Sequence, residues 1–271
     1  MPTDHHSWSS IAADNFSYPE GVSAQRISDE LSGMLVSPDP EVRDHQAYTA
    51  AARWIGEGRL DEVLEDLGDT AVERFTHPEI QARSFAPLVL RCVLARAATV
   101  PHAVSKDSAE HWWAAFATWY PAEEDTRGWD DSLGWLHAVA HGADAAAAFA
   151  QALPARRAAL LELCARRMTA PTDYRYVQLE DARVARAICR ILVEPGLSAE
   201  QATDWLTVVS RAFEGGGPGP VPPWAFNSIA TLQSLHLHLT RGLDEGRVPP
   251  HAAVVAANAV AILKLPYNWL A

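Results

Sequence analysis

Residues 125–151 read DTRGWDDSLGWLHAVAHGADAAAAFAQ, and this stretch decides both the expected fold and the expected site. Its larger part, residues 132–151, has the pattern of a helix and not the apolar–polar alternation of a strand. His137, His141 and Asp144 are spaced i, i+4 and i+7 within it. At about 100° per residue, the three side chains would project from one narrow stripe of that helix.

Further helical patterns, separated by Pro and Gly, follow one another along the chain. We expect helices at 23–36, 40–57, 59–68, 78–98, 107–119, 132–151, 155–169, 178–193, 198–213, 223–241 and 249–264. Ser198, followed by Gln201, matches a capping box at one helix start. Polar residues 1–22 indicate a flexible arm, and EGGGPGPVPP at 214–223 indicates a loop, either a linker or a lid.

Long helices joined by short loops favour antiparallel pairs. The apolar centres of the expected helices recur about every 40–50 residues, an interval that suits HEAT or armadillo repeats; they lie near Trp54, Leu94, Leu136, Ile188 and Leu235. We therefore predict an all-α fold with a single helical domain over 23–271. Its antiparallel helical hairpins are expected to stack as a HEAT/armadillo-like solenoid.

The composition and charge of the chain argue against nucleic acid and membranes as binding partners. A net charge of −12 argues against a nucleic-acid-binding protein, which usually carries a basic surface for phosphates. The longest apolar run, around 252–263, is too short to cross a membrane, and the N-terminus has no signal-peptide pattern. Cys92, Cys164 and Cys189 lie in separate apolar contexts and are interpreted as free thiols. We therefore expect a cytoplasmic protein that binds neither membrane nor nucleic acid.

Several blocks of sequence together resemble one protein family. In order they read VRDHQAYTAAARWI (42–55), RSFAPLVL (83–90), EEDTRGW (123–129), GWLHAVAHGAD (134–144) and EDARVARAI (180–188). Over about residues 26–265 the chain resembles the uncharacterised bacterial domain-of-unknown-function family number 2785. The resemblance implies an all-helical, solenoid-like fold and no particular activity. Where such proteins commonly read RGY, this chain has Trp129 as the aromatic residue.

The stripe of His137, His141 and Asp144 offers the ligand types that suit zinc or non-haem iron. Three ligands from one helix are awkward for a single ion, because residues i and i+7 lie about 10.5 Å apart along the axis. The two histidines with a carboxylate from a neighbouring segment, or His141 with Asp144, would fit better. The alternative is a hydrogen-bonded polar network without metal. Gly142 would let another helix or a ligand approach closely.

The residues before this helix supply further candidates. Asp131 and Ser132 are expected to cap it. Asp125 and Arg127 would form an ion pair or present a carboxylate and a guanidinium group to a ligand. Trp129 and Trp135 would shape a pocket for a small organic substrate.

Two residues from other segments complete the candidate set. Arg83, like Arg43 and Asp44, is a polar residue expected to line the concave face of a solenoid, and it is a candidate for binding substrate. Glu180 is a second such candidate, although its spacing to Arg183 is also that of an ordinary helical ion pair.

Two hypotheses for function remain open. The first is an enzyme for polar hydrolysis, elimination or a related step on a small molecule. His137, His141, Asp144 and Asp125 would be its catalytic groups, with zinc or iron as a possible cofactor. The second is a non-catalytic helical-repeat scaffold that holds a peptide on its concave face, with structural histidines. No nucleotide-binding, zinc-protease or serine-hydrolase motif occurs in the sequence.

Overall fold

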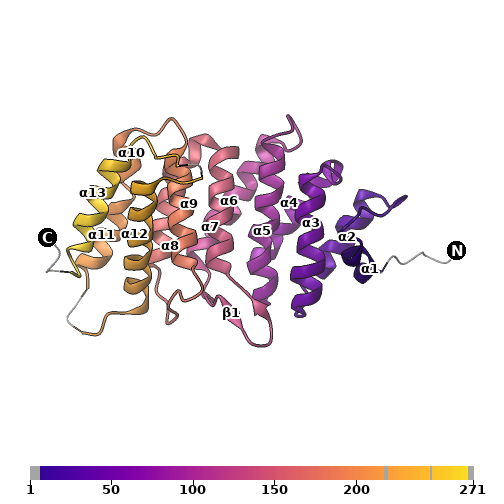
Figure 1. Cartoon of the computed structure of the whole chain (residues 1–271), viewed down its shortest axis with the longest axis horizontal. Helices are drawn as coiled ribbons and strands as arrows, with labels where there is room; N and C mark the ends of the chain where they lie inside the picture. The colour runs from indigo at the N-terminus through magenta and orange to yellow at the C-terminus, as the bar shows by residue number, and fades with distance from the viewer. Residues whose placement is uncertain (1–6, 217–218, 245, 268–271) are drawn as a thin grey trace. The chain divides into compact units, whose positions relative to one another are not determined.

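A computed structural model describes residues 7–216, 219–244 and 246–267 of the chain (Figure 1). Its helices are α1 Trp8–Ala13, α2 Ala24–Met34, η1 Glu41–Tyr48, α3 Thr49–Gly56, η2 Asp61–Val63, α4 Leu64–Glu73, η3 Arg74–Thr76, α5 Ile80–Ala97, α6 Lys106–Ala122, α7 Ala138–Ala152, η4 Pro154–Arg156, α8 Arg157–Thr169, α9 Glu180–Val193, α10 Ala199–Thr203, α11 Leu206–Glu214, α12 Pro223–Arg241 and α13 Ala252–Leu263. Two short strands, β1 Trp129–Asp130 and β2 Gly134–Trp135, form an antiparallel ladder. The predicted all-α class is confirmed in this coarse form. Among the described helices, none is both long and apolar enough to cross a membrane.

The contacts divide the chain into two compact units. The first unit comprises residues 1–115 and 129–136, and the second comprises 116–128 and 137–271. The division by contacts does not tell whether either unit folds on its own, so the single domain predicted over 23–271 stays a prediction.

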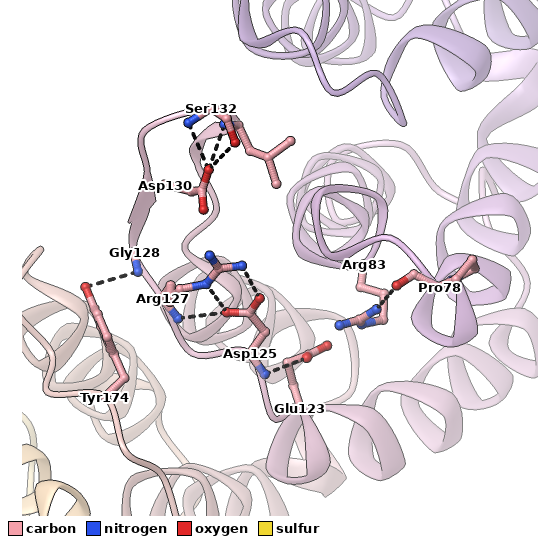
Figure 2. A network of polar contacts seen from close by, with 10 residues as sticks. Pro78, Arg83, Glu123, Asp125, Arg127, Gly128, Asp130, Ser132 and Tyr174 are labelled. Carbon is pink, nitrogen blue, oxygen red and sulfur yellow. Dashed lines mark hydrogen bonds and ion pairs between the residues drawn. The ribbon is translucent and has the colours of Figure 1, made fainter.

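The predicted helix over 132–151 is wrong in its first six residues, because α7 begins only at Ala138. The preceding residues form the β1–β2 hairpin, in which Trp129 pairs with Trp135 and Asp130 with Gly134. In the turn, the Asp130 carboxylate accepts hydrogen bonds from the Ser132 and Leu133 amides at 2.9 and 3.0 Å (Figure 2). Asp131 and Ser132 therefore lie in a hairpin turn and do not cap a helix.

Arg43 holds this hairpin within the first unit. It lies on η1, a π-helix, and its side chain is completely buried. Its Nη2 atom donates to the Leu133 and Trp135 carbonyl oxygens at 2.7 and 3.2 Å. Its guanidinium also lies 2.7 Å from the Asp44 carboxylate and stacks over the Phe85 ring. Arg43 therefore binds both the hairpin and Asp44, and its buried side chain does not line an open surface as the sequence predicted.

The N-terminal segment also differs from the predicted flexible arm. Within its described part, residues 7–22, Trp8–Ala13 form α1 and the Phe16 side chain is buried. The fully buried Trp54 of α3 donates from its indole nitrogen to the Phe16 carbonyl oxygen at 2.9 Å. Tyr18 packs edge-on against the same indole ring. Aromatic packing onto α3 thus holds this segment in place.

The second unit is built around α9, which packs against both α7 and α12 (Figure 1). Helix α8 packs against α7, α9, α11 and α12. The predicted close approach at Gly142 is confirmed, because an added Cβ atom would lie only 2.2 Å from the Tyr120 ring. Tyr120 is fully buried, and its hydroxyl donates to the Val139 carbonyl oxygen at 2.8 Å.

We expect Ser198→Ala to lower the free energy of unfolding by about 1 kcal/mol. The predicted capping box at α10 is confirmed: the Ser198 hydroxyl accepts from the Gln201 amide, and the Gln201 side chain accepts from the Ser198 amide. Urea denaturation of the variant measures the loss. Ser9→Ala, at an exposed serine within α1, is the control and should change stability by less than about 0.5 kcal/mol. Equal stability of the two variants would contradict the role given to the cap.

Candidate functional site

The predicted stripe of three residues on one helix does not form, because His137 lies outside α7. It is the residue before the helix, with a left-handed backbone (φ 53°), whereas His141 and Asp144 lie on α7. The His137 amide donates to the Arg127 carbonyl oxygen at 3.2 Å, which holds it beside the Asp125–Gly128 segment. The two imidazole rings are nevertheless close, with centroids 5.6 Å apart.

Asp144 pairs with an arginine, so it does not join the two histidines as the predicted third ligand for zinc or iron. Both carboxylate oxygens of Asp144 accept hydrogen bonds from Arg183 of α9. Among the described residues, no group of three or more His, Cys, Asp or Glu side chains is arranged to hold a metal ion. The combination of His137, His141 and Asp144 therefore does not converge on one ion.

His137 instead faces Glu180, the first residue of α9. The Glu180 Oε1 atom lies 3.3 Å from His137 Nδ1, and the Glu180 side chain is completely buried while that of His137 keeps 13% exposure. The second carboxylate oxygen accepts a hydrogen bond from the Gln178 amide at 2.9 Å. The predicted Glu180–Arg183 ion pair is wrong, because packing of α9 against α7 directs these two side chains to His137 and Asp144 respectively. As a buried residue, Glu180 is also poorly placed to bind substrate directly.

A glycine allows the Asp125–Gly128 segment to lie directly against this carboxylate. A Cβ atom at Gly128 would lie 2.0 Å from Glu180 Oε1, so any larger residue would displace the glutamate. The Gly128 amide donates to the Tyr174 hydroxyl at 3.3 Å, as Figure 2 shows. Burial raises the pKa of Tyr174, and the Gly128 hydrogen bond opposes this. The hydroxyl therefore stays protonated at neutral pH.

Asp125 and Arg127 form the ion pair that the sequence suggested. Two hydrogen bonds of 2.9 and 2.6 Å join the Arg127 guanidinium to the Asp125 carboxylate (Figure 2). The Asp125 amide donates to the Glu123 carboxylate at 3.0 Å, which orients the pair. The Arg127 side chain is 41% exposed, so its positive charge lies at the surface of the protein.

The other three predicted substrate-binding residues belong to the first unit. Arg83 donates to the His77 and Pro78 carbonyl oxygens at 2.8 and 2.9 Å, the second contact being drawn in Figure 2. Trp129 and Trp135 stand edge to face across the hairpin, with ring centroids 4.8 Å apart and 43% exposure each. Trp129 and Trp135 are paired residues of the β1–β2 ladder, and this pairing explains the contact between their rings.

Comparison with known proteins assigns the chain to a family. A family model described as "Protein of unknown function (DUF2785)" matches residues 71–237, which is more than half of the chain. The chain belongs to this family. No curated protein and no solved structure matches it. The matched region contains His137, His141 and Glu180, whereas Arg43 lies before it.

Sequence reasoning missed the partners that complete the polar site. Arg183 was visible in the EDARVAR block but was paired with the wrong acid, and Tyr174 lies in a loop without any motif. Arg167 of α8, which no sequence motif marks, is buried and donates to the Tyr120 and Glu123 carbonyl oxygens at 3.1 and 2.6 Å. Cys164 on the same helix offers no nucleophile, because burial raises the pKa of its thiol to about 12.

Proposed function

We propose that this protein is an enzyme that moves a proton on a small polar substrate at His137, in a hydrolysis, elimination or related step. The observation that carries the proposal is the buried Glu180 carboxylate, 3.3 Å from His137 Nδ1. A carboxylate beside Nδ1 favours the proton on that nitrogen, and in this tautomer Nε2 is the basic nitrogen of the ring. Glu180 orients His137, and His137 acts on the substrate.

The energetic cost of this arrangement supports a functional role. Burying a carboxylate costs several kcal/mol unless it is compensated, and the Gln178 amide and the N-terminus of α9 offset this cost. In addition, His137 and Leu179, which precede α7 and α9, both have left-handed backbones with φ of 53° and 66°. Such conformations cost about 1–2 kcal/mol each in residues with a side chain, and they concentrate at functional sites.

Arg127 supports an anionic substrate, such as a carboxylate or phosphate ester. Its carbonyl oxygen is bonded to the His137 amide, so the two residues are neighbours. Asp125 fixes the orientation of its guanidinium, whose side chain is 41% exposed and carries a positive charge that attracts an anion. Proton transfer by His137 proceeds without the zinc or iron cofactor that the sequence suggested.

A substrate panel tests the proposal. Purified protein is incubated with small carboxylic esters, amides, phosphate esters and hydroxy acids, and product formation is followed by mass spectrometry. For any compound turned over, we expect His137→Gln to lower kcat by about 10²–10⁴-fold, the usual contribution of a general acid–base group. His111→Gln, at an exposed histidine of α6, should leave kcat unchanged. Equal turnover by wild type and His137→Gln would refute the assignment.

The second candidate is a non-catalytic scaffold that binds a peptide. It is favoured by the Gln178 hydrogen bond, because a carboxylate that accepts from this amide stabilises the start of α9 without any catalytic role. In the second unit α9 contacts α7 on one side and α12 on the other, and α8 contacts α11. These contacts between successive helices support HEAT/armadillo-like stacking. In that case no compound of the panel is turned over, and His137→Gln changes only the stability.

The proposed setting is a reducing cytoplasm without nucleic-acid partners. The three cysteines, Cys92, Cys164 and Cys189, are free thiols, which supports that compartment. The net charge of −12 supports small molecules or proteins, and not nucleic acid, as partners.

A further inference from the structure

A cavity of about 290 Å³ lies in the second unit among α10, α11 and α13, apart from the His137 site. Both α10 and α11 pack against α13, so the cavity sits over a helical contact. Its lining comprises Thr203, Asp204, Leu206, Thr207, Ser210, Asn258, Ala261, Ile262 and Leu265. The polar lining residues determine which ligand it can accept.

Each hydroxyl group of the lining already donates its hydrogen atom to an acceptor within the protein. Thr203 donates to the Ala199 carbonyl oxygen at 3.0 Å, and Thr207 donates to the Asp204 carbonyl oxygen at 2.6 Å. Ser210 donates to the Glu214 carboxylate at 2.7 Å. Because a hydroxyl group carries a single hydrogen, these three groups can offer only lone pairs to a ligand.

The remaining polar groups add to the excess of acceptors. Asn258 uses one N–H to donate to the Val254 carbonyl oxygen at 2.8 Å, which leaves its side-chain oxygen and a second N–H. The exposed Asp204 carboxylate makes no hydrogen bond or ion pair with any described residue. The cavity therefore carries one negative charge and several acceptors against a single donor.

Apolar side chains form the rest of the wall. Leu206 and Ile262 are buried beneath the cavity, and Leu265 is half-exposed at its edge. Such a wall excludes water from one side of a bound chain and favours an aliphatic segment. A ligand that fits both parts has an alkyl stem and a head that donates hydrogen bonds.

We propose that this cavity binds an organic cation with a primary ammonium group on a short alkyl chain. The ammonium group donates to Asp204 and to the hydroxyl oxygens, and its stem packs on Leu206 and Ile262. An ammonium carries three N–H donors and no acceptor, which complements the lining. The net charge of −12 also favours the approach of cations.

Titration with n-pentylamine hydrochloride, followed through the backbone amide signals of the ¹⁵N-labelled full chain, tests this site. We expect saturable shifts at the lining residues of α10, α11 and α13. The same concentrations of 1-pentanol and sodium pentanoate should give no saturable shifts there. Absence of saturation with pentylamine, or equal binding of the alcohol, overturns the proposal.

Variants sharpen the test. Asp204→Asn should weaken pentylamine binding about tenfold, because a charge-assisted hydrogen bond is lost. Asp173→Asn removes one charge from the exposed loop before α9 and should leave the affinity unchanged. Asn258→Asp adds a carboxylate to the cavity and should tighten binding several-fold. Equal weakening in Asp204→Asn and Asp173→Asn, or no gain in Asn258→Asp, shows that general charge and not this cavity controls binding.

Discussion

Replacing Arg43 with methionine should lower the free energy of unfolding by about 3–5 kcal/mol, because the change removes a fully buried charged donor that serves several acceptors. The guanidinium of Arg43 is completely buried and serves the Ser37, Leu133 and Trp135 carbonyl oxygens together with the Asp44 carboxylate. Methionine fills a similar length but donates no hydrogen bond. The β1–β2 hairpin then loses its anchor within the first unit.

The loss should depend on pH in a defined direction. Burial raises the pKa of Asp44, and the neighbouring Arg43 guanidinium lowers it. Without Arg43, the folded-state pKa of Asp44 rises further above the unfolded value. Such a carboxyl destabilises the fold when it is ionised and ceases to do so once it is protonated. The difference between wild type and variant should therefore shrink as the pH falls through the folded-state pKa of Asp44.

Urea denaturation at neutral and acidic pH measures both effects. Arg26→Met is the control, since the 40% exposed Arg26 side chain pairs with Glu30 within α2, and its loss should cost at most about 1 kcal/mol. Similar losses in the two variants would contradict the role of Arg43.

Replacing Arg167 with methionine should cost about 2–3 kcal/mol, the second large effect. Arg167 is buried in α8 and donates to the Tyr120 and Glu123 carbonyl oxygens, at and just beyond the last turn of α6. Its removal leaves both oxygens without this charged donor. The desolvation cost of the buried cation disappears as well, so the net loss of stability is smaller than the summed free energies of the two hydrogen bonds.

The neighbouring Arg166 provides the control for this prediction, because it lies on the same helix and is exposed. Arg166→Met should change stability by less than about 0.5 kcal/mol. Thermal denaturation of both variants distinguishes them, and equal midpoints would show that Arg167 does not support the end of α6.

The helices were predictable because their signals are local and long. An apolar pattern that repeats over ten or more residues marks α5, α9 or α12 by itself, and the Ser198 box marks α10. The β1–β2 hairpin was not predictable, since strands of two residues are too short to show an alternating pattern. Its anchor, Arg43, lies 90 residues before Leu133.

The candidate site shows the same limit. The closeness of His137 and His141 follows from their sequence spacing, although His137 precedes the helix. Which carboxylate each polar group meets depends on how α9 packs on α7, and this packing places Glu180 at His137 and Arg183 at Asp144. No spacing within one segment contains that information.

The protonation of the His137 ring tests the central claim most directly. Long-range ¹H–¹⁵N correlation spectra distinguish the two tautomers of a neutral imidazole, and His137→Gln assigns the signals. With Glu180 beside Nδ1, we expect the neutral ring to carry its proton on Nδ1 and not on Nε2. A neutral His137 with its proton on Nε2 would contradict the proposal that Glu180 prepares this histidine to accept a proton.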